Sequence, residues 1–290
     1  MGTDSILFPN LHITLAHVGQ GIRIGPFWIA FYGICIAAAM LAGIYLAMFL
    51  AKRTGQDPDT YFNFAIVTVI LSVIGARLYY VAFSWDYYSA HPAQIPDLRG
   101  GGLAIYGGVI TGICCAVIFC RMKRLNLRLF LDTALPAVTL GQVIGRWGNF
   151  FNRAVFGGYS DHLLAMALPL EILPADEVTQ AMRAHPLVSD GVTFALVHPT
   201  FLYESLWNFV LLIVMLTIII RDRKRFNGEI ACLYLIGYGL GRFWIEGIRT
   251  DRLMIPGTML PVSQVISGIM TVAGTLWLFL GIRRSHRDSR

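Results

Sequence analysis

The chain has 290 residues, of which 56% are apolar and only 14% are charged, and its mean hydropathy is +0.62. Soluble globular proteins are about one-quarter charged, so this chain could not cover the surface of a soluble domain. The composition predicts a polytopic integral membrane protein. The net charge of +6 could indicate a nucleic-acid partner, but the basic residues lie at the ends of apolar runs, which favours contact with anionic lipid headgroups and no nucleic acid.

Apolar runs of about 20 residues, the length that crosses a bilayer as a helix, follow one another along the chain. They predict an all-α fold with seven transmembrane helices in a single membrane domain over residues 1–290. The first 25 residues lack the pattern of a cleaved signal peptide, so we expect the spans themselves to anchor the chain. The expected spans cover about 27–50, 62–83, 103–120, 129–150, 200–220, 230–248 and 262–282.

A polar insert, residues 153–198, separates the fourth and fifth expected spans. It contains several prolines and acidic residues such as Glu171, Asp176 and Glu177. Because it is long and polar, it predicts a small cap outside the membrane.

The distribution of Lys and Arg predicts the orientation of the chain. One set of loops is rich in them, at about 52–53, 121–128, 221–225 and 283–290. Cytoplasmic loops carry this excess, so the N-terminus and the cap are expected outside and the C-terminus in the cytoplasm. The other side carries fewer, namely Arg23, Arg99, Arg153, Arg183, Arg249 and Arg252.

The cysteines do not indicate a metal or disulfide site. All five lie inside apolar runs, where small core residues are expected. No His and Cys residues have the spacing of a zinc site. The sequence therefore predicts neither a metal nor a cofactor.

Three arginines lie inside the predicted spans: Arg77, Arg146 and Arg242. Each costs roughly 2.5–3.5 kcal/mol at the centre of a membrane helix if it has no partner. A structural ion pair with Glu204 or Glu246 is one explanation, and for Arg77 it is as plausible as any other. For Arg146 and Arg242 we favour a bound ligand because of the polar residues around them.

These polar residues share one depth in the predicted bundle. With the orientation above, the arginines fall in the outer halves of their spans. Arg242, Glu246 and Arg249 occupy positions i, i+4 and i+7, which lie on one helix face. A shared layer predicts one polar cavity that opens outward. The other members of this layer are Tyr32, Tyr106 and Glu204.

The run 145-GRWGNFFN-152 places Arg146 and Asn149 on one face and ends at Asn152. The glycines around them allow a helix or a headgroup to approach the backbone closely. Because a guanidinium presents a planar fork of donors that matches phosphate, phospholipid phosphate is the expected ligand. His198, before Pro199, would by itself be a helix-capping residue.

Several segments resemble the prolipoprotein diacylglyceryl transferase family. The run 141-GQVIGRWGNFFNRAVFGG-158 is similar to the family signature, which includes a later glycine at Gly157. The resemblance extends over essentially the whole chain in the same order. The other matching segments are 102-GLAIYGG-108, 198-HPTFLYE-204 and 237-GYGLGRFWIEGIR-249.

The resemblance implies a bacterial multi-pass enzyme of the cytoplasmic (inner) membrane. Members transfer the diacylglyceryl group of phosphatidylglycerol to the lipobox cysteine in prolipoprotein signal peptides and release glycerol 1-phosphate. It assigns Arg146 and Arg242 to essential phosphate or headgroup contacts. We expect the substrate-binding set to be Arg146, Tyr32, Asn149, Asn152, Gly157, His198, Glu204, Glu246 and Arg249, with Arg242 and Tyr106 catalytic beside Arg146.

Two positions depart from the family pattern. Ala154 stands where a Glu is common, and Tyr106 stands where many members carry His. An unperturbed phenol titrates near 10, so Tyr106 is a poor general base. We expect it to orient the thiol or the headgroup, and to act as a base only if a nearby Arg lowers its pKa.

An anion transporter and a lipid-binding membrane protein are the alternatives. A transporter requires polar residues along a full path across the membrane. Here they gather in the outer half, and the inner halves of most spans are apolar. The transferase is therefore the favoured interpretation.

Overall fold

The computed structural model describes residues 2–98 and 101–288 and divides into two compact units. Unit 1 comprises residues 1–43 and 135–290, and unit 2 comprises residues 44–134. Arg99 and Arg290, which contribute to the predicted orientation, lie outside the described residues. The helices are α1 (Phe31–Arg53), α2 (Pro58–Phe83), α3 (Trp85–Ala90), α4 (Ile105–Met122), α5 (Leu127–Asn152), α6 (Gln180–Ala184), α7 (Thr200–Ile220), α8 (Glu229–Ile248) and α9 (Val262–Asp288), with short 3-10 turns at Pro9–Leu11, Pro92–Gln94 and Leu170–Ile172.

Six of the described helices are long and apolar enough to cross a membrane. They are α1, α2, α4, α5, α7 and α9. Helix α8 is 20 residues long, but Glu229, Arg242 and Glu246 lie in it, and it is not among the six. The mostly helical, multi-pass membrane character predicted from the composition is confirmed.

The prediction of an all-α fold is wrong for the N-terminal segment and for the insert between α5 and α7. Within the described residues, strands from both segments form one antiparallel sheet in the order β2-β1-β5-β7-β6. A separate hairpin, β3–β4, precedes α1. The strands are β1 (Ile6–Phe8), β2 (Ile13–Leu15), β3 (Gly21–Ile24), β4 (Phe27–Ala30), β5 (Met166–Pro169), β6 (Leu187–Ser189) and β7 (Val192–Val197).

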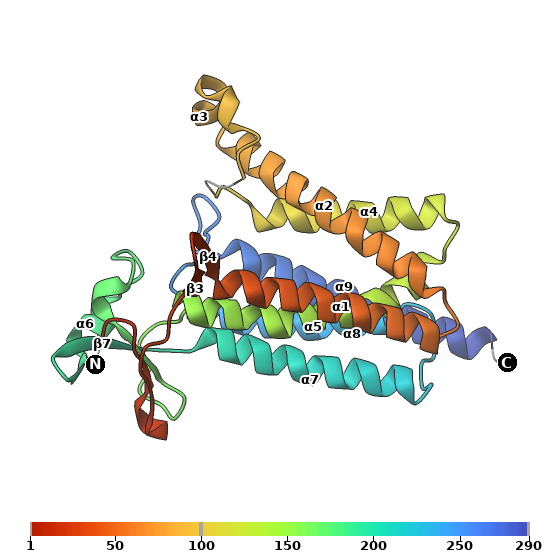
Figure 1. Ribbon diagram of the computed structural model, residues 1–290. Coiled ribbons are helices and arrows are strands. Elements are labelled where there is room, and N and C mark those ends of the chain that lie inside the picture. Colours follow the sequence, from red (N-terminus) through yellow and green to blue (C-terminus); the bar gives the residue numbers. More distant parts are fainter. Residues whose placement is uncertain (1, 99–100, 289–290) are drawn as a thin grey trace. The chain divides into compact units, whose positions relative to one another are not determined.

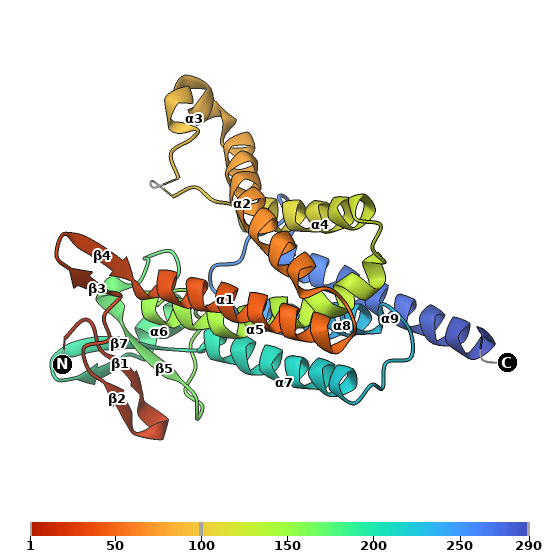
Figure 2. The same cartoon turned by 45° about the vertical axis from the view of Figure 1, so that its right-hand side comes forward.

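The sheet of unit 1 has its own apolar core near the start of α7 (Figure 2). Ile6, Met166, Leu168 and Val197 are buried together there. Arg153 joins the N-terminal segment to this core, because its Nη2 donates to the carbonyl oxygens of Asp4 at 2.6 Å and Val18 at 2.5 Å. The first residues of the chain are thus part of the same small domain as the insert.

Close helix packing in unit 1 depends on small residues, as is common in membranes. Figure 1 shows α5, α7 and α8 side by side. A Cβ on Gly43 of α1 would lie 3.1 Å from the Ala137 carbonyl oxygen of α5. Ser205 Oγ of α7 donates to the Val143 carbonyl of α5 at 2.9 Å. These contacts hold α5 close to α1 and α7.

Unit 2 is built on α2 and α4. Helix α2 begins after Asp57, whose carboxylate accepts hydrogen bonds from the backbone N–H groups of Asp59 and Thr60 at 3.2 and 3.1 Å. This is an N-cap of the preferred type. A Cβ on Gly107 of α4 would lie 2.5 Å from the Gly75 carbonyl oxygen of α2, so the two helices are in close contact.

Candidate functional site

A buried carboxylate, Glu204, is the centre of a charged network in unit 1. Helix α5 supplies Arg146, whose Nε lies 2.5 Å from Glu204 Oε2. Helix α8 supplies Arg242, whose Nη1 donates to Glu204 Oε1 at 2.6 Å. Glu204 itself lies in the first turns of α7. One carboxylate therefore holds two guanidinium groups from different helices.

The network continues along α8 to the residues that follow it. Arg242 Nη2 lies 2.6 Å from Glu246 Oε2. Arg249 Nη1 lies 3.7 Å from Glu204 Oε1 and 3.9 Å from Glu246 Oε2. Arg249 also makes a bidentate pair with Asp251, at 2.8 and 2.6 Å. Burial alone would raise the pKa of Asp251, but the hydrogen bonds and charge of Arg249 hold it below its ordinary value.

The side chains of this network differ in exposure, but their formal charges balance. The Glu204 side chain is 3% exposed, whereas those of Arg242 and Arg146 are 14% and 21% exposed. Arg146, Arg242 and Arg249 are balanced in formal charge by Glu204, Glu246 and Asp251. The structure therefore shows the ion pairs that we considered as the structural alternative for Arg146 and Arg242.

The pairing does not use every donor of Arg146. Its contact with Glu204 is made through Nε, and within residues 2–98 and 101–288 its Nη1 and Nη2 groups form no hydrogen bond. These groups are the planar, paired donors that bind phosphate bidentately. The partly exposed guanidinium can thus hold Glu204 and a phosphate oxygen at the same time.

The other predicted substrate-binding residues of α1 and α5 do not join the charged network in the described part of the chain. Tyr32 is 41% exposed, and its ring lies 2.7 Å from where a Cβ on Gly148 would be. Asn149 is partly buried and Asn152 is exposed. Their side chains have no hydrogen bond to Glu204 or Glu246 in the described part of the chain.

Gly157 connects the insert to the residues after α8. Its N–H donates to the His198 carbonyl at 2.9 Å, and it pairs with Arg249 as an isolated antiparallel bridge. A Cβ at this position would lie 2.8 Å from both the Ile248 carbonyl oxygen and His198 Cβ. Only glycine allows this close approach without a shift of the backbone.

His198 is part of a triangle that the sequence did not predict. His162 Nε2 lies 3.2 Å from His198 Nδ1, and the Tyr203 hydroxyl lies 3.3 Å from His198 Nδ1 and 3.1 Å from His162 Nε2. Burial and then the charge of His162 lower the pKa of His198. His162 lies within the insert and belongs to no recognisable motif, so this contact could not be predicted from the sequence.

Tyr106 and Arg77 both belong to unit 2. Tyr106 lies in the first turn of α4, and its predicted catalytic role stays a prediction. Arg77 is 6% exposed and donates to backbone carbonyls rather than to an acid, so the ion pair considered for it is wrong. These carbonyls belong to Gln94, Ile95, Gly101 and Gly102, at 2.8–3.0 Å.

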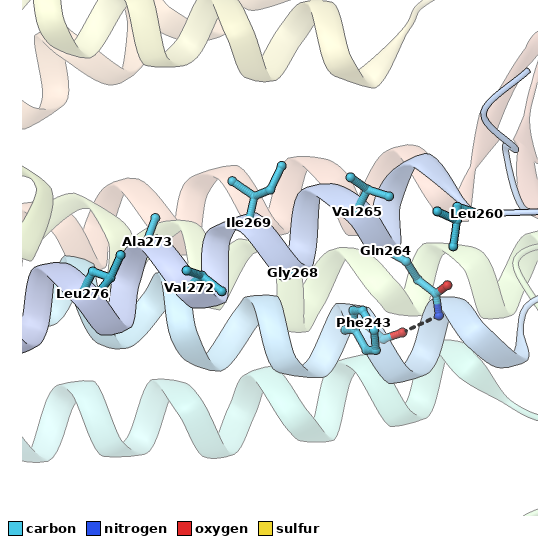
Figure 3. Close-up of a pocket in the computed structure, with 9 residues that line it drawn as sticks. All are labelled: Phe243, Leu260, Gln264, Val265, Gly268, Ile269, Val272, Ala273 and Leu276. Carbon is cyan, nitrogen blue, oxygen red and sulfur yellow. Dashed lines mark hydrogen bonds between the residues drawn. The ribbon is translucent and has the colours of Figure 1, made fainter. Parts of the chain in front are cut away.

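Two concave features of unit 1 differ in character. An apolar groove of about 510 Å³ runs along α9, and its one polar lining side chain, Gln264, donates to the Phe243 carbonyl at 3.0 Å (Figure 3). A much smaller cavity of about 10 Å³ is lined by Glu204, Asn208, Tyr238 and Arg242, among others. The second lies beside the charged network, because Glu204 and Arg242 form part of its wall. Among the described residues, no group of three or more His, Cys, Asp or Glu side chains could hold a metal ion.

Comparison with known proteins gives a consistent result. A family model described as prolipoprotein diacylglyceryl transferase matches residues 20–280. A phosphatidylglycerol–prolipoprotein diacylglyceryl transferase of Streptococcus agalactiae is 43% identical over 265 residues, which cover 91% of this chain and 96% of the relative. Enzymes of the same name from Synechococcus elongatus and Finegoldia magna are 38% and 40% identical over 274 and 248 residues, covering 92% and 86% of this chain and 89% of each relative.

Proposed function

This chain belongs to the prolipoprotein diacylglyceryl transferase family and is a transferase of that activity, and from this premise we propose how it acts. Its lipid substrate is phosphatidylglycerol, and its acceptor is the lipobox cysteine of a prolipoprotein signal peptide. The similarity to named enzymes over most of the chain supports the transferase over an anion transporter or a lipid-binding protein. The observation that carries the site assignment is the pair of arginines from α5 and α8 on one carboxylate.

The reaction joins one sulfur to one carbon. The cysteine sulfur forms a bond to the terminal glycerol carbon of the diacylglyceryl group, and the bond from that carbon to the phosphate oxygen breaks. The electron pair stays on the released glycerol 1-phosphate. Because it keeps this electron pair, the departing phosphate gains one negative charge as the bond breaks, and the thiol proton passes to solvent.

Arg146 and Arg242 are placed to stabilise that charge. A guanidinium about 4 Å from a unit charge contributes about 4 kcal/mol at an effective dielectric constant of 20, before desolvation. Ionising a thiol with a pKa near 8.5 costs about 2 kcal/mol at pH 7. The arginines can therefore favour both the thiolate and the departing phosphate without an imidazole at position 106.

Glu204 gives these arginines fixed positions before the lipid binds. Because Glu204 pairs with both arginines, its negative charge offsets the repulsion between the two guanidinium groups. The charge balance of the network also means that a phosphate meets organised donors rather than a large excess of positive charge. Tyr32, Asn149, Asn152, Gly157, His198 and Glu246 are the proposed supporting contacts for the headgroup, and Tyr106 orients the thiol.

The membrane arrangement follows from the same proposal. Helix α8 crosses the membrane as a seventh span, because Arg242 and Glu246, which reduce its hydropathy, are paired with each other. The N-terminus and the 153–198 cap lie on the extracytoplasmic side of a bacterial inner membrane, and the C-terminus lies in the cytoplasm. Labelling of single cysteines at positions 162 and 287 with a membrane-impermeant reagent tests this, since only position 162 should react in intact spheroplasts.

The activity is tested with purified enzyme in liposomes. Labelled phosphatidylglycerol and a synthetic lipobox peptide should give a thioether-linked peptide and one equivalent of glycerol 1-phosphate, with EDTA present and no nucleotide added. A peptide with Ser in place of the lipobox Cys is the control. Anion flux without any thioether product would contradict the proposal and support the transporter.

A further inference from the structure

Among the described residues, Arg249 has three carboxylates near it and a close ion pair with one of them. Asp251 accepts hydrogen bonds from its Nε at 2.8 Å and from its Nη2 at 2.6 Å. The Nη1 of Arg249 lies 3.7 Å from Glu204 Oε1 and 3.9 Å from Glu246 Oε2, which is beyond hydrogen-bond distance. Two of its nitrogens are thus bonded to Asp251, and the third lies near both glutamates without a bond to either.

The two glutamates already have close partners. Glu204 pairs with Arg146 at 2.5 Å and with Arg242 at 2.6 Å, and Arg242 also pairs with Glu246 at 2.6 Å. Arg249 is only 8% exposed. Because a buried charge without a partner is costly, Arg249 would move toward Glu204 or Glu246 if it lost Asp251.

The backbone before Asp251 is tied to the start of the insert. The Gly158 N–H donates to the Ile248 carbonyl at 2.9 Å. The backbone N–H and Oγ1 of Thr250 donate to the Phe156 carbonyl at 3.3 and 3.1 Å. Because these bonds come immediately before Asp251 in the chain, its carboxylate is presented to Arg249 from a fixed backbone.

We propose that Asp251 is a positioning residue that keeps Arg249 away from Glu204. Glu204 is thereby left to hold Arg146 and Arg242 where they meet the phosphate. The inference rests on the proposed function, because it takes these two arginines as the phosphate contacts. Without the charge of Asp251, three guanidinium groups would share two carboxylates, and Arg249 would displace another arginine from its place on Glu204.

Asp251→Asn keeps the size of the side chain and removes its charge. In the liposome assay, kcat should fall about tenfold, which is within the range of couplings inside one ion-pair network. The KM for phosphatidylglycerol should change less than threefold, because the arginines act mainly on charge that builds in the transition state. A purely structural role would lower the melting temperature and leave kcat per folded molecule unchanged. Asp176→Asn is the matched control, since it removes the same charge from an exposed site in the insert, and it should match the wild type.

Arg249→Gln provides the second arm of the test. When Arg249 is absent, it cannot compete for Glu204, so Asp251→Asn should cause no further loss of kcat in this background. An equal loss of kcat with and without Arg249 would overturn the inference, as would wild-type kcat in the single variant Asp251→Asn.

A structure of the Asp251→Asn variant gives a readout that does not require activity. A guanidinium of Arg249 within hydrogen-bond distance of Glu204 or Glu246 would support the inference, whereas one that keeps its wild-type distances would overturn it. If the wild type forms no thioether product, the proposed function has failed, but the position of Arg249 in the variant is still observed.

Discussion

Arg77 in unit 2 and Arg146 and Arg242 in unit 1 are all arginines within apolar helices, but different partners stabilise their guanidinium groups. Arg77 donates through Nε, Nη1 and Nη2 to backbone carbonyls and lies under the ring of Tyr88 at 5.1 Å. Arg146 and Arg242 meet a carboxylate instead and keep part of their surface exposed. An arginine whose donors are all used by the backbone holds a fold together, whereas one that is held by an acid with donors to spare is available to a ligand.

The substitution with the largest expected effect is Glu204→Gln, which removes the carboxylate that Arg146 and Arg242 share. Arg146 would lose its acid and Arg242 would keep only Glu246, and breaking a buried pair costs about 3–5 kcal/mol of the free energy of unfolding. Transferase activity should be lost as well. Thermal unfolding in detergent and the liposome assay measure the two effects. Glu229→Gln is the matched control, because this buried acid pairs with Arg225, which is half exposed; it should lose less stability and keep its activity.

Arg146→Lys tests whether the planar donors of Arg146 bind the ligand. Lysine keeps the charge and can reach Glu204, but it lacks the planar pair of donors. We expect kcat/KM to fall about 10²–10³-fold, as when one transition-state donor is removed, with little change in the melting temperature. Full activity in this variant would remove the phosphate-binding role of Arg146.

Arg77→Lys tests the arginine that is held by backbone carbonyls. At least two carbonyls should lose their donor, at about 1–1.5 kcal/mol each, so the free energy of unfolding should fall by about 2–3 kcal/mol. The activity per folded molecule should stay close to that of the wild type. A large loss of kcat without loss of stability would show that Arg77 also has a role in the reaction.

A pair of neighbouring glycines tests the junction between the insert and the end of α8. Gly157→Ala places a Cβ 2.8 Å from the Ile248 carbonyl oxygen, whereas nothing lies within 4 Å of a Cβ on Gly158. Overpacking of this kind typically costs about 1–3 kcal/mol. Gly157→Ala should therefore lower the melting temperature and kcat/KM, and Gly158→Ala should change neither.

The smallest expected effect concerns the acid stability of the insert between α5 and α7. The folded chain resists protonation of His198, whose pKa is lowered by burial and by His162. Above about pH 6.5, the ordinary pKa of His, the imidazole is neutral in both states and contributes no pH dependence. As the pH falls below this value, the unfolded chain takes up a proton more readily, so stability is lost. The melting temperature should drop less between pH 7 and 5 in His198→Gln than in wild type, whereas His185→Gln, at an exposed site, should follow the wild type.

The sequence predicted the family, the activity and the multi-pass helical character, because motifs and apolar runs are local features. It also named Arg146, Arg242, Glu204, Glu246 and Arg249, which the structure brings into contact, although their roles in binding and catalysis stay predictions. It did not show that Arg77 is held by carbonyls, since any residue can supply a carbonyl. His162 was missed because it matters through neighbours, His198 and Tyr203, that only the fold provides.

The sheet was missed for a related reason. Its strands are three to six residues long, which is too short for a clear alternation of apolar and polar residues. Strand β1 pairs with β5, and Leu7 lies opposite Ala167. The formation of a strand at residues 6–8 therefore depends on a partner strand far along the chain.

That pairing sets an order of events during biosynthesis. Leu7 leaves the ribosome long before its partner Ala167. At about 5–20 residues per second, the growing N-terminal segment waits on the order of ten seconds or more while α1, α2, α4 and α5 emerge and enter the bilayer. The five-stranded sheet is completed only when the insert meets a segment that was made first.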